Sequence, residues 1–380
     1  MERLLIKNVV LIGSEGKQLP AVDIFVEDGL IKDIAGEITP PSNCEIMDAE
    51  GAYASAGWTD AHTHIIWGED SPQLDDKLIY PHDGLTCIVD AGSSGPAGYE
   101  EVHEKMKNSD IQIKAYLNVA RNGISMSGGE LKSMDYLDKD MFCKTHEKYP
   151  DEIIGVKIRI DPRVNVNIMA SLEATREIAD RLNLPMIVHP SRCPENLETI
   201  LPLFKEGDVF AHTYSALEPC ILDKDGKVKE CVWDARKRGV WFDLSHGSAN
   251  FSFDVARQAM DQGFVIDTIS TDLHTMNLKG PVRSMTDVMN KMLCLGMSLE
   301  DIICKVTKTP LEMLGIQDKD FDVKNGRPAD ITIFREVSGE YTFQDSYGNT
   351  AESCKRIEVA ATVCGRSLYF PRHCVFYHNK

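Results

Sequence analysis

The histidines of this chain occupy one kind of position. Six of the eleven end short apolar runs that are typical of buried β-strands: His62, His64, His189, His212, His246 and His274. His62 and His64 are two residues apart, so both side chains lie on one face of an extended segment and can bind one ion. That pair alone is a weak signal, because two core or surface histidines can have the same spacing. His189 and His212 strengthen it, since imidazole is the commonest ligand of zinc-like metals.

Two other titratable residues interrupt apolar runs. Lys157 lies inside IIGVKIRI, where a buried ammonium is unfavourable unless it is paired or neutral. A neutral amine can add carbon dioxide to form a carbamate, a bidentate anion that bridges two metal ions. The alternative is a lysine that pairs with an acid or reaches the surface. Asp272, within TISTDLH, can ligate a metal and accept a proton as general base, or it can cap a helix or turn.

Further residues near the predicted strand ends are candidates for substrate binding. His246 and His274 are two of them, with packed structural histidines as the alternative. Four arginines follow strand ends in this acidic chain: Arg121, Arg159, Arg163 and Arg192. Any of them could bind a substrate carboxylate bidentately, or form surface ion pairs instead. Arg159 is preferred because it lies two residues beyond Lys157 and points to the same side; Asn118 is a further candidate.

These residues require elements that carry them to one place. Eight apolar runs alternate with helical patterns, and they occupy residues 53–64, 86–92, 113–120, 153–160, 185–191, 209–214, 240–246 and 268–274. Helical patterns between them include 171–183, 195–207 and 252–263. Eight strand and helix units over this length match a (β/α)8 barrel, whose active sites lie at the carboxyl ends of the strands. A doubly wound open sheet is the alternative, although no GxGxxG follows the first strand.

Both ends of the chain show a different pattern. The first fifty residues and residues 328–370 read as short strands separated by glycine and acidic turns. We therefore predict an α/β protein, a (β/α)8 TIM barrel over residues 54–317 with a small β-sandwich domain built from both termini, residues 1–53 plus 318–380.

Composition restricts the partners. The 380 residues carry 41 Lys and Arg against 59 Asp and Glu, a net charge of −18, which opposes binding to nucleic acid or an anionic membrane. No apolar stretch approaches the length of a membrane span, and no secretory signal is evident. The eleven cysteines form no CxxC pair, which favours reduced thiols and a cytoplasmic location. We expect a small-molecule substrate, with a homo-oligomer possible.

Residues 1–370 resemble the amidohydrolase superfamily of metal-dependent hydrolases. The segments that carry the resemblance are GWTDAHTH, GVKIR, IVHP, AHTY, STDLH, VTKTPLEMLG and GRPADITIF. DAGSSGPAGYEEV and FDLSHGSANFSF are similar to a deacetylase-like group that is often filed under dihydroorotase or D-aminoacylase. One departure is KTP in place of the commoner NP step in VTKTPLEMLG, in a helix away from the expected ligands.

The resemblance implies two divalent metal ions, Zn²⁺ being the expected metal. His62, His64 and Asp272 would hold the first ion, His189 and His212 the second, and carboxylated Lys157 would bridge them. The implied reaction is hydrolysis of a small N-acyl, O-acyl or cyclic amide substrate, expected to bear a carboxylate. A metal-bridging hydroxide would attack, with Asp272 as general acid and base.

Two other functions remain open. A one-metal deaminase of the same fold usually has a proton-shuttling glutamate near the fifth-strand histidine, whereas this chain reads HPSRCPEN there and Lys157 would have no role. A non-catalytic scaffold is disfavoured because all six expected ligands are present. No GxSxG motif indicates a serine nucleophile.

Overall fold

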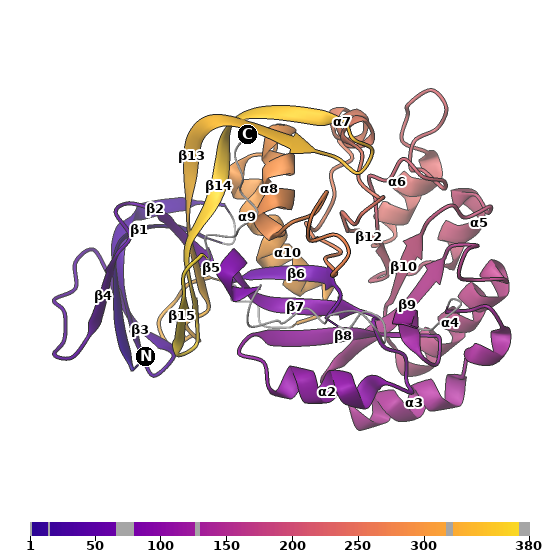
Figure 1. Cartoon of the computed structure of the whole chain (residues 1–380), viewed down its shortest axis with the longest axis horizontal. Coiled ribbons are helices and arrows are strands. Elements are labelled where there is room, and N and C mark those ends of the chain that lie inside the picture. Colours follow the sequence, from indigo (N-terminus) through magenta and orange to yellow (C-terminus); the bar gives the residue numbers. More distant parts are fainter. Residues whose placement is uncertain (1, 14–15, 66–79, 126–129, 317–321, 372–380) are drawn as a thin grey trace.

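The computed structural model describes residues 2–13, 16–65, 80–125, 130–316 and 322–371. Its elements form a parallel sheet with helices packed around it and a second, mixed sheet beside it (Figure 1). No helix within these ranges is both long enough and apolar enough to cross a membrane.

The parallel sheet carries the strand ends on which the candidate residues lie. It has seven strands in the order β12-β11-β10-β9-β8-β7-β6. They are β6 (Trp58–Thr63), β7 (Leu85–Ala91), β8 (Gln112–Asn118), β9 (Ile153–Ile160), β10 (Met186–Pro190), β11 (Val209–Phe210) and β12 (Trp241–Phe242). Nearly every residue of these strands is buried, as in sheets that are covered on both faces.

The segment that was predicted as the eighth strand is not a regular strand. Residues 268–273 instead make isolated parallel bridges to both edges of the sheet, Thr268 with Asp243 and Leu273 with Thr63. Asp272 has a φ of 52°, which interrupts the extended backbone between these bridges. The backbone is therefore not extended at Asp272, the residue that the sequence predicts to be a metal ligand and general base.

Helices follow most of the strands and cover the outer face of the sheet (Figure 1). They are α2 (Tyr99–Lys107), α3 (Lys139–Lys148), α4 (Ile168–Leu182), α5 (Leu197–Ile200), α6 (Glu230–Lys237), α7 (Phe253–Asp261), α8 (Met285–Cys294), α9 (Leu299–Val306) and α10 (Lys308–Met313). Short 3₁₀ turns occur at η1 (Pro81–Asp83), η2 (Gly123–Ser125), η3 (Met134–Tyr136) and η4 (Leu201–Leu203). The helix that was expected over 195–207 is reduced to α5 and η4, because Pro202 has no N–H for an α-helical hydrogen bond.

The mixed sheet joins the two ends of the chain. Its order is β15-β14-β13-β5-β1-β2-β3, with β4 paired to β1. The strands are β1 (Arg3–Ile12), β2 (Gln18–Glu27), β3 (Leu30–Ala35), β4 (Glu45–Asp48), β5 (Tyr53–Ala56), β13 (Ile331–Gln344), β14 (Thr350–Cys364) and β15 (Ser367–Tyr369). β5 links the ends, because it pairs with β1 on one side and with β13 on the other. Hydrogen bonds connect all eight strands in one sheet, and the β-sandwich arrangement stays a prediction.

The first predicted apolar run, 53–64, contains two strands that belong to different sheets. β5 lies in the mixed sheet and β6 in the parallel sheet, and Gly57 separates them. A Cβ atom at Gly57 would lie 2.0 Å from Thr86 Oγ1, so only glycine allows this close approach. The proposed domain boundary at 53/54 falls inside β5, and the boundary at 317/318 lies outside the described residues.

The hairpin of β13 and β14 extends from the mixed sheet past α8, and its tip lies near α7 (Figure 1). Asn290 of α8 pairs its amide with both backbone groups of Ile357 in β14, at 3.0 and 2.6 Å. At the tip, Tyr347 Oη donates to Ala249 O at 2.8 Å and Ser346 Oγ donates to Gly247 O at 3.2 Å. The hairpin therefore holds the segment that follows β12.

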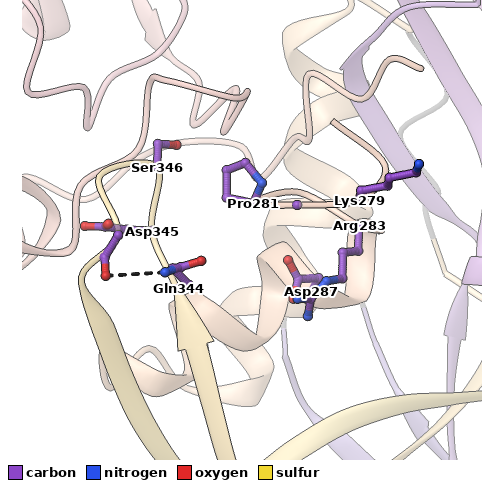
Figure 2. A pocket seen from close by; sticks show the side chains of 9 residues that line it. Lys279, Pro281, Arg283, Asp287, Gln344, Asp345 and Ser346 are labelled. Carbon is purple, nitrogen blue, oxygen red and sulfur yellow. Dashed lines mark hydrogen bonds between the residues drawn. The ribbon is translucent and has the colours of Figure 1, made fainter. Parts of the chain in front are cut away.

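A polar cavity of about 310 Å³ lies beside this hairpin (Figure 2). Its wall is formed by Lys279, Gly280, Pro281, Arg283, Asp287, Gln344, Asp345, Ser346 and Gly348. None of the six predicted metal ligands lines it, so this cavity is separate from the candidate site.

Candidate functional site

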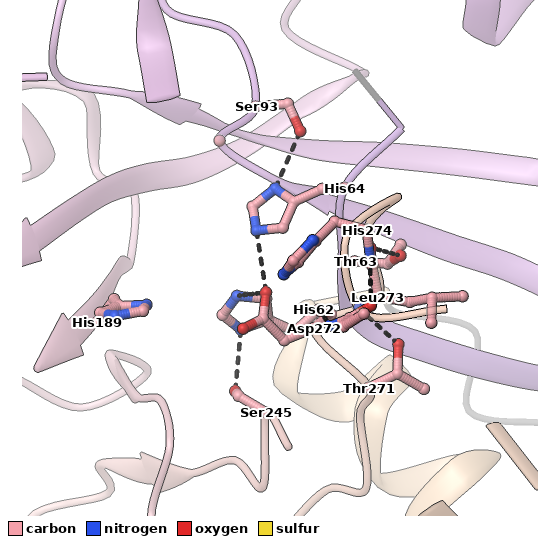
Figure 3. A network of polar contacts seen from close by, with 12 residues as sticks. His62, Thr63, His64, Ser93, His189, Ser245, Thr271, Asp272, Leu273 and His274 are labelled. Atoms are coloured by element: carbon pink, nitrogen blue, oxygen red, sulfur yellow. Dashed lines mark hydrogen bonds and ion pairs between the residues drawn. The ribbon is translucent and has the colours of Figure 1, made fainter. Parts of the chain in front are cut away.

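His62 and His64 at the end of β6 meet Asp272 in the interior (Figure 3). His64 Nε2 lies 3.1 Å from Asp272 Oδ1, and His62 Nε2 lies 3.8 Å from the same oxygen. One ligand atom from each of these three buried residues fits within a 4.8 Å cluster. The spacing of two residues along β6 thus places both imidazoles beside one carboxylate.

Asp272 is held ionised by its neighbours. Burial alone would raise the pKa of this carboxyl, but the contact with His64 and the nearby imidazoles of His62 and His212 outweigh burial and keep the pKa well below its ordinary value. Its backbone is also fixed, because Asp272 N donates to His62 O at 2.6 Å and Asn277 Nδ2 donates to Asp272 O at 2.8 Å. A carboxylate therefore points at the two imidazoles.

Lys157 on β9 is fully buried beside the same cluster. Its Nζ atom lies 3.1 Å from His62 Nε2. Burial lowers the pKa of this amine to about 8, because the charged form is poorly solvated there. Gly92, with a φ of +82°, makes room for the side chain, since a Cβ atom at that position would lie 2.5 Å from Lys157 Cγ.

His189 and His212 form a second pair of imidazoles. His189 lies on β10 and His212 two residues beyond β11, and His189 Nδ1 is 2.6 Å from His212 Nε2. Burial lowers the pKa of His212 to about 3 and that of His189 well below its ordinary value. His212 Nε2 lies 4.0 Å from Asp272 Oδ2, so the second pair adjoins the first cluster.

The residues present fit a divalent metal centre. His212 Nδ1 lies 2.5 Å from Ser245 O, and because a carbonyl only accepts, that nitrogen carries the proton and Nε2 is left as a ligand atom. His62 Nδ1 and His64 Nδ1 contact serine hydroxyls, so their Nε2 atoms also face the centre. Imidazole nitrogen with carboxylate oxygen is the donor set that suits zinc-like ions. The structure thus brings together all six predicted ligands.

The four predicted substrate residues lie in different surroundings. His274 is buried near this centre, its ring 6.4 Å from that of His64, and burial lowers its pKa to about 4. His246 turns away from the six residues: its Nε2 atom is 3.0 Å from Lys291 Nζ and its ring packs on Phe251. Lys291 in turn pairs with Asp287 at 3.0 Å, which joins His246 to the wall of the polar cavity.

Arg159 and Asn118 converge on a buried carboxylate that the sequence analysis did not identify. Arg159 Nε lies 2.9 Å from Glu130 Oε1, and Asn118 Nδ2 donates to Glu130 Oε2 at 3.1 Å. Asn118 also donates to Gly92 O and accepts from Ala120 N, so both of its amide N–H groups are used within the protein. Glu130 stands in a polar stretch without periodicity, where no pattern marks it as buried.

The other three arginines have local partners. Arg121 pairs with Asp138 at 2.9 Å and Arg163 pairs with Asp161, and both arginine side chains are more than 45% exposed. Arg192 donates to the neighbouring Ser191 Oγ at 3.2 Å. Among the described residues, Arg159 is the one of these four arginines that pairs with Glu130, the carboxylate that Asn118 also contacts.

No protein-family model matches the chain. A deacetylase of Enterococcus faecalis is 31% identical over 375 residues, which cover 96% of this chain and 98% of that protein. A solved structure described as an adenine deaminase has a TM-score of 0.88 and 29% identity, covering 97% of this chain and all of the other. One described as a dihydroorotase has a TM-score of 0.88 and 27% identity, covering 98% and 100%.

The likeness extends over nearly the whole length of each of these proteins, and it includes both sheets. The solved structures are TIM-barrel enzymes in which a parallel sheet and a second mixed sheet occur together, as they do in this chain. The similar deacetylase, deaminase and dihydroorotase are all metal-dependent amidohydrolases. The chain is therefore a member of the amidohydrolase superfamily, a metal-dependent hydrolase of amide or ester bonds, as its motifs predict.

Proposed function

We propose that this protein is a binuclear, zinc-dependent hydrolase that removes a small acyl group from an N-acyl or O-acyl substrate. The observation that carries the proposal is the position of Lys157. Its amine is buried among imidazoles, and its charge contributes to lowering the pKa of His62, His189 and His212. Among the described residues it is hydrogen-bonded to His62 and not to a carboxylate. A carbamate on this amine would carry the bridging oxygens that two ions require.

The two bridges made by residues 268–273 support a closed arrangement. We propose that this segment takes the place of the eighth strand and completes the (β/α)8 barrel, since it contacts β6 at one edge and the continuation of β12 at the other. Closure places the carboxyl ends of all strands around one mouth. The ligands from β6, β9 and β10 would then face each other across that mouth.

His62, His64 and Asp272 would hold one ion, and His189 and His212 the other, with carboxylated Lys157 between them. When bound, the ions would supply Lewis acidity, which lowers the pKa of a water toward neutrality and polarises the scissile carbonyl. The protein orients these groups in a buried site, where the charged groups interact strongly.

Asp272 is the candidate for moving the proton. The oxygen of water bonds to the carbonyl carbon, the carbon–nitrogen or carbon–oxygen bond breaks, and the proton of water goes to the leaving amine or alcohol. Asp272 accepts that proton and delivers it, because its carboxyl is ionised and 6% exposed, so that it can reach a bound substrate.

Arg159 is the candidate for a substrate carboxylate. Glu130 engages its Nε, which leaves the other guanidinium N–H groups as donors, and 17% of the side chain is exposed. A charge-assisted bidentate pair would orient an anionic substrate beside the scissile bond. The proposed substrate is therefore a small carboxylate-bearing molecule.

A deaminase is the second candidate function, because one similar solved structure is described as an adenine deaminase. In this chain HPSRCPEN has no glutamate directly beside His189, which favours acyl hydrolysis. Release of ammonia from aminopurines by the purified protein distinguishes the two.

The test combines metal analysis with a substrate panel. The protein is incubated with zinc and bicarbonate, its metal content is measured, and it is assayed against N-acyl and O-acyl amino and hydroxy acids. We expect close to two ions per chain and hydrolysis of at least one acyl class. His146→Ala, on α3, serves as a histidine control that should keep both ions. A persistent ratio of one ion, or ammonia release without acyl hydrolysis, would contradict the proposal.

A further inference from the structure

Each histidine of the pair at the end of β6 contacts a serine hydroxyl (Figure 3). Each of these serines is in turn hydrogen-bonded to a buried aspartate. His64 Nδ1 lies 2.9 Å from Ser93 Oγ, which donates to Asp90 Oδ2 at 2.6 Å. His62 Nδ1 lies 2.9 Å from Ser245 Oγ, which donates to Asp243 Oδ2. The two arrangements come from different strands, Asp90 from β7 and Asp243 from the segment after β12.

The direction of the hydrogen bonds at Asp90 follows from the number of protons. Backbone N–H groups can only donate, and Asp90 accepts from Ser93 N at 2.7 Å and from Ile65 N at 3.0 Å. Both carboxylate oxygens are therefore acceptors. Ser93 has one hydroxyl proton and gives it to Asp90, so its oxygen can only accept from His64 Nδ1.

Asp243 is arranged in the same way with a different set of donors. Besides Ser245, it accepts from Ser270 Oγ and Thr268 Oγ1, each at 2.6 Å, and all of these residues are completely buried. Three hydroxyl donors occupy its oxygens. Because the proton of Ser245 is directed at Asp243, the serine oxygen accepts from His62 Nδ1.

We infer that the Ser93–Asp90 and Ser245–Asp243 dyads are positioning elements that fix His62 and His64 as Nδ1–H tautomers and so aim both Nε2 lone pairs at the metal centre. The inference rests on the proposed metal function, because a tautomer matters here only if Nε2 binds an ion. Lys157 Nζ agrees with this assignment, since it is placed to donate to His62 Nε2 at 3.1 Å.

Ser245 has a second contact that makes the inference specific. Its hydroxyl contacts His62 of the first proposed ion, whereas its carbonyl accepts from His212 of the second at 2.5 Å. Replacing the side chain removes the first contact and leaves the second. Ser245→Ala should therefore weaken the binding of the first ion and leave the binding of the second unchanged.

The first experiment measures zinc binding to metal-free protein by competition with a chromophoric chelator. Loss of a hydrogen-bond partner of a ligating histidine typically weakens metal affinity by about 10–100-fold. We expect the affinity for one of the two zinc ions to fall by this factor in Ser93→Ala and in Ser245→Ala. Ser171→Ala is the matched control, because Ser171 of α4 is equally buried but bonds Ile168 O and Asn165. The zinc affinity of this variant should equal that of the wild type.

The second experiment measures the wild-type protein and uses a variant only to assign one resonance. Long-range ¹H–¹⁵N spectra of metal-free wild-type protein labelled at histidine report which ring nitrogen carries the proton. We expect His62 to be protonated at Nδ1, with its resonance assigned by loss in His62→Gln. Protonation at Nε2, or zinc affinities of both serine variants equal to that of Ser171→Ala, would overturn the inference. Failure of the wild type to bind zinc would instead refute the metal function and leave the tautomer measurement to decide the role of the dyads.

Discussion

Gly92→Ala tests whether the position of Lys157 determines the second metal ion. Gly92 has a φ of +82°, and a Cβ atom there would lie 2.5 Å from Lys157 Cγ, 2.6 Å from Lys157 Cβ and 3.4 Å from Asn118 Cβ. Carbon atoms pack at about 3.5–4.0 Å, so the lysine stem must move by about 1 Å. That movement pulls the amine away from His62, which it contacts at 3.1 Å.

The destabilisation expected for Gly92→Ala has two parts, one from the backbone and one from packing. A left-handed backbone costs an alanine about 1–2 kcal/mol, and overpacking of a buried site costs about 1–3 kcal/mol. We therefore expect the free energy of unfolding to fall by about 2–5 kcal/mol in total. A displacement of about 1 Å at a catalytic site can lower turnover by about 10²-fold.

Gly263→Ala separates the two parts. Gly263 has the same φ of +82°, but a Cβ atom there meets no atom within 4 Å. In this control the free energy of unfolding should fall only by the backbone part, about 1–2 kcal/mol, and turnover and metal content should equal those of the wild type. The measurements are urea unfolding, metal per chain and kcat/KM. Should folded Gly92→Ala match Gly263→Ala in kcat/KM and metal content, Lys157 would not bridge two ions as argued.

Three further predictions concern the reaction itself. Lys157→Ala should lose most activity and one metal ion per chain, and a short carboxylic acid should restore part of both; retained two-metal content by elemental analysis would contradict the bridge. Asp272→Asn should keep its metal but lose turnover by about 10²–10⁴-fold, because an amide cannot accept the proton; near-normal kcat with metal retained would exclude the proton transfer. Arg159→Met should abolish the preference in kcat/KM for a carboxylate-bearing substrate over its methyl ester, and an unchanged preference would place the clamp elsewhere.

The candidate ligands could be predicted because burial makes them conspicuous. A lysine inside IIGVKIRI or an aspartate inside TISTDLH is unfavourable in a core, so it stands out in an apolar run whatever the detailed fold. The motifs that contain them also led to the superfamily, which the comparisons confirm. Functional residues are therefore easiest to predict from sequence where an ionisable side chain interrupts an apolar run.

Element boundaries and supporting contacts were harder to predict. Residues 53–64 read as one strand, because a change of partner sheet at Gly57 leaves no trace in the apolar pattern. Glu130 gave no signal, since its burial depends on Arg159 and Asn118, which are distant in sequence. The dyads lie in DAGSS and FDLSH, segments noted for their family likeness, but which serine meets which histidine depends on strand register.

The β13–β14 hairpin has a consequence for the order in which the protein is made. A ribosome releases the chain from its amino terminus, and domains generally fold in that order. Tyr347 and Ser346 hold the segment of Gly247 and Ala249, and a Cβ atom at Gly247 would lie 2.5 Å from Asp272 Oδ2. The residues that support this part of the site therefore leave the ribosome after Asp272, so a nascent chain already carries every proposed ligand before these contacts can form.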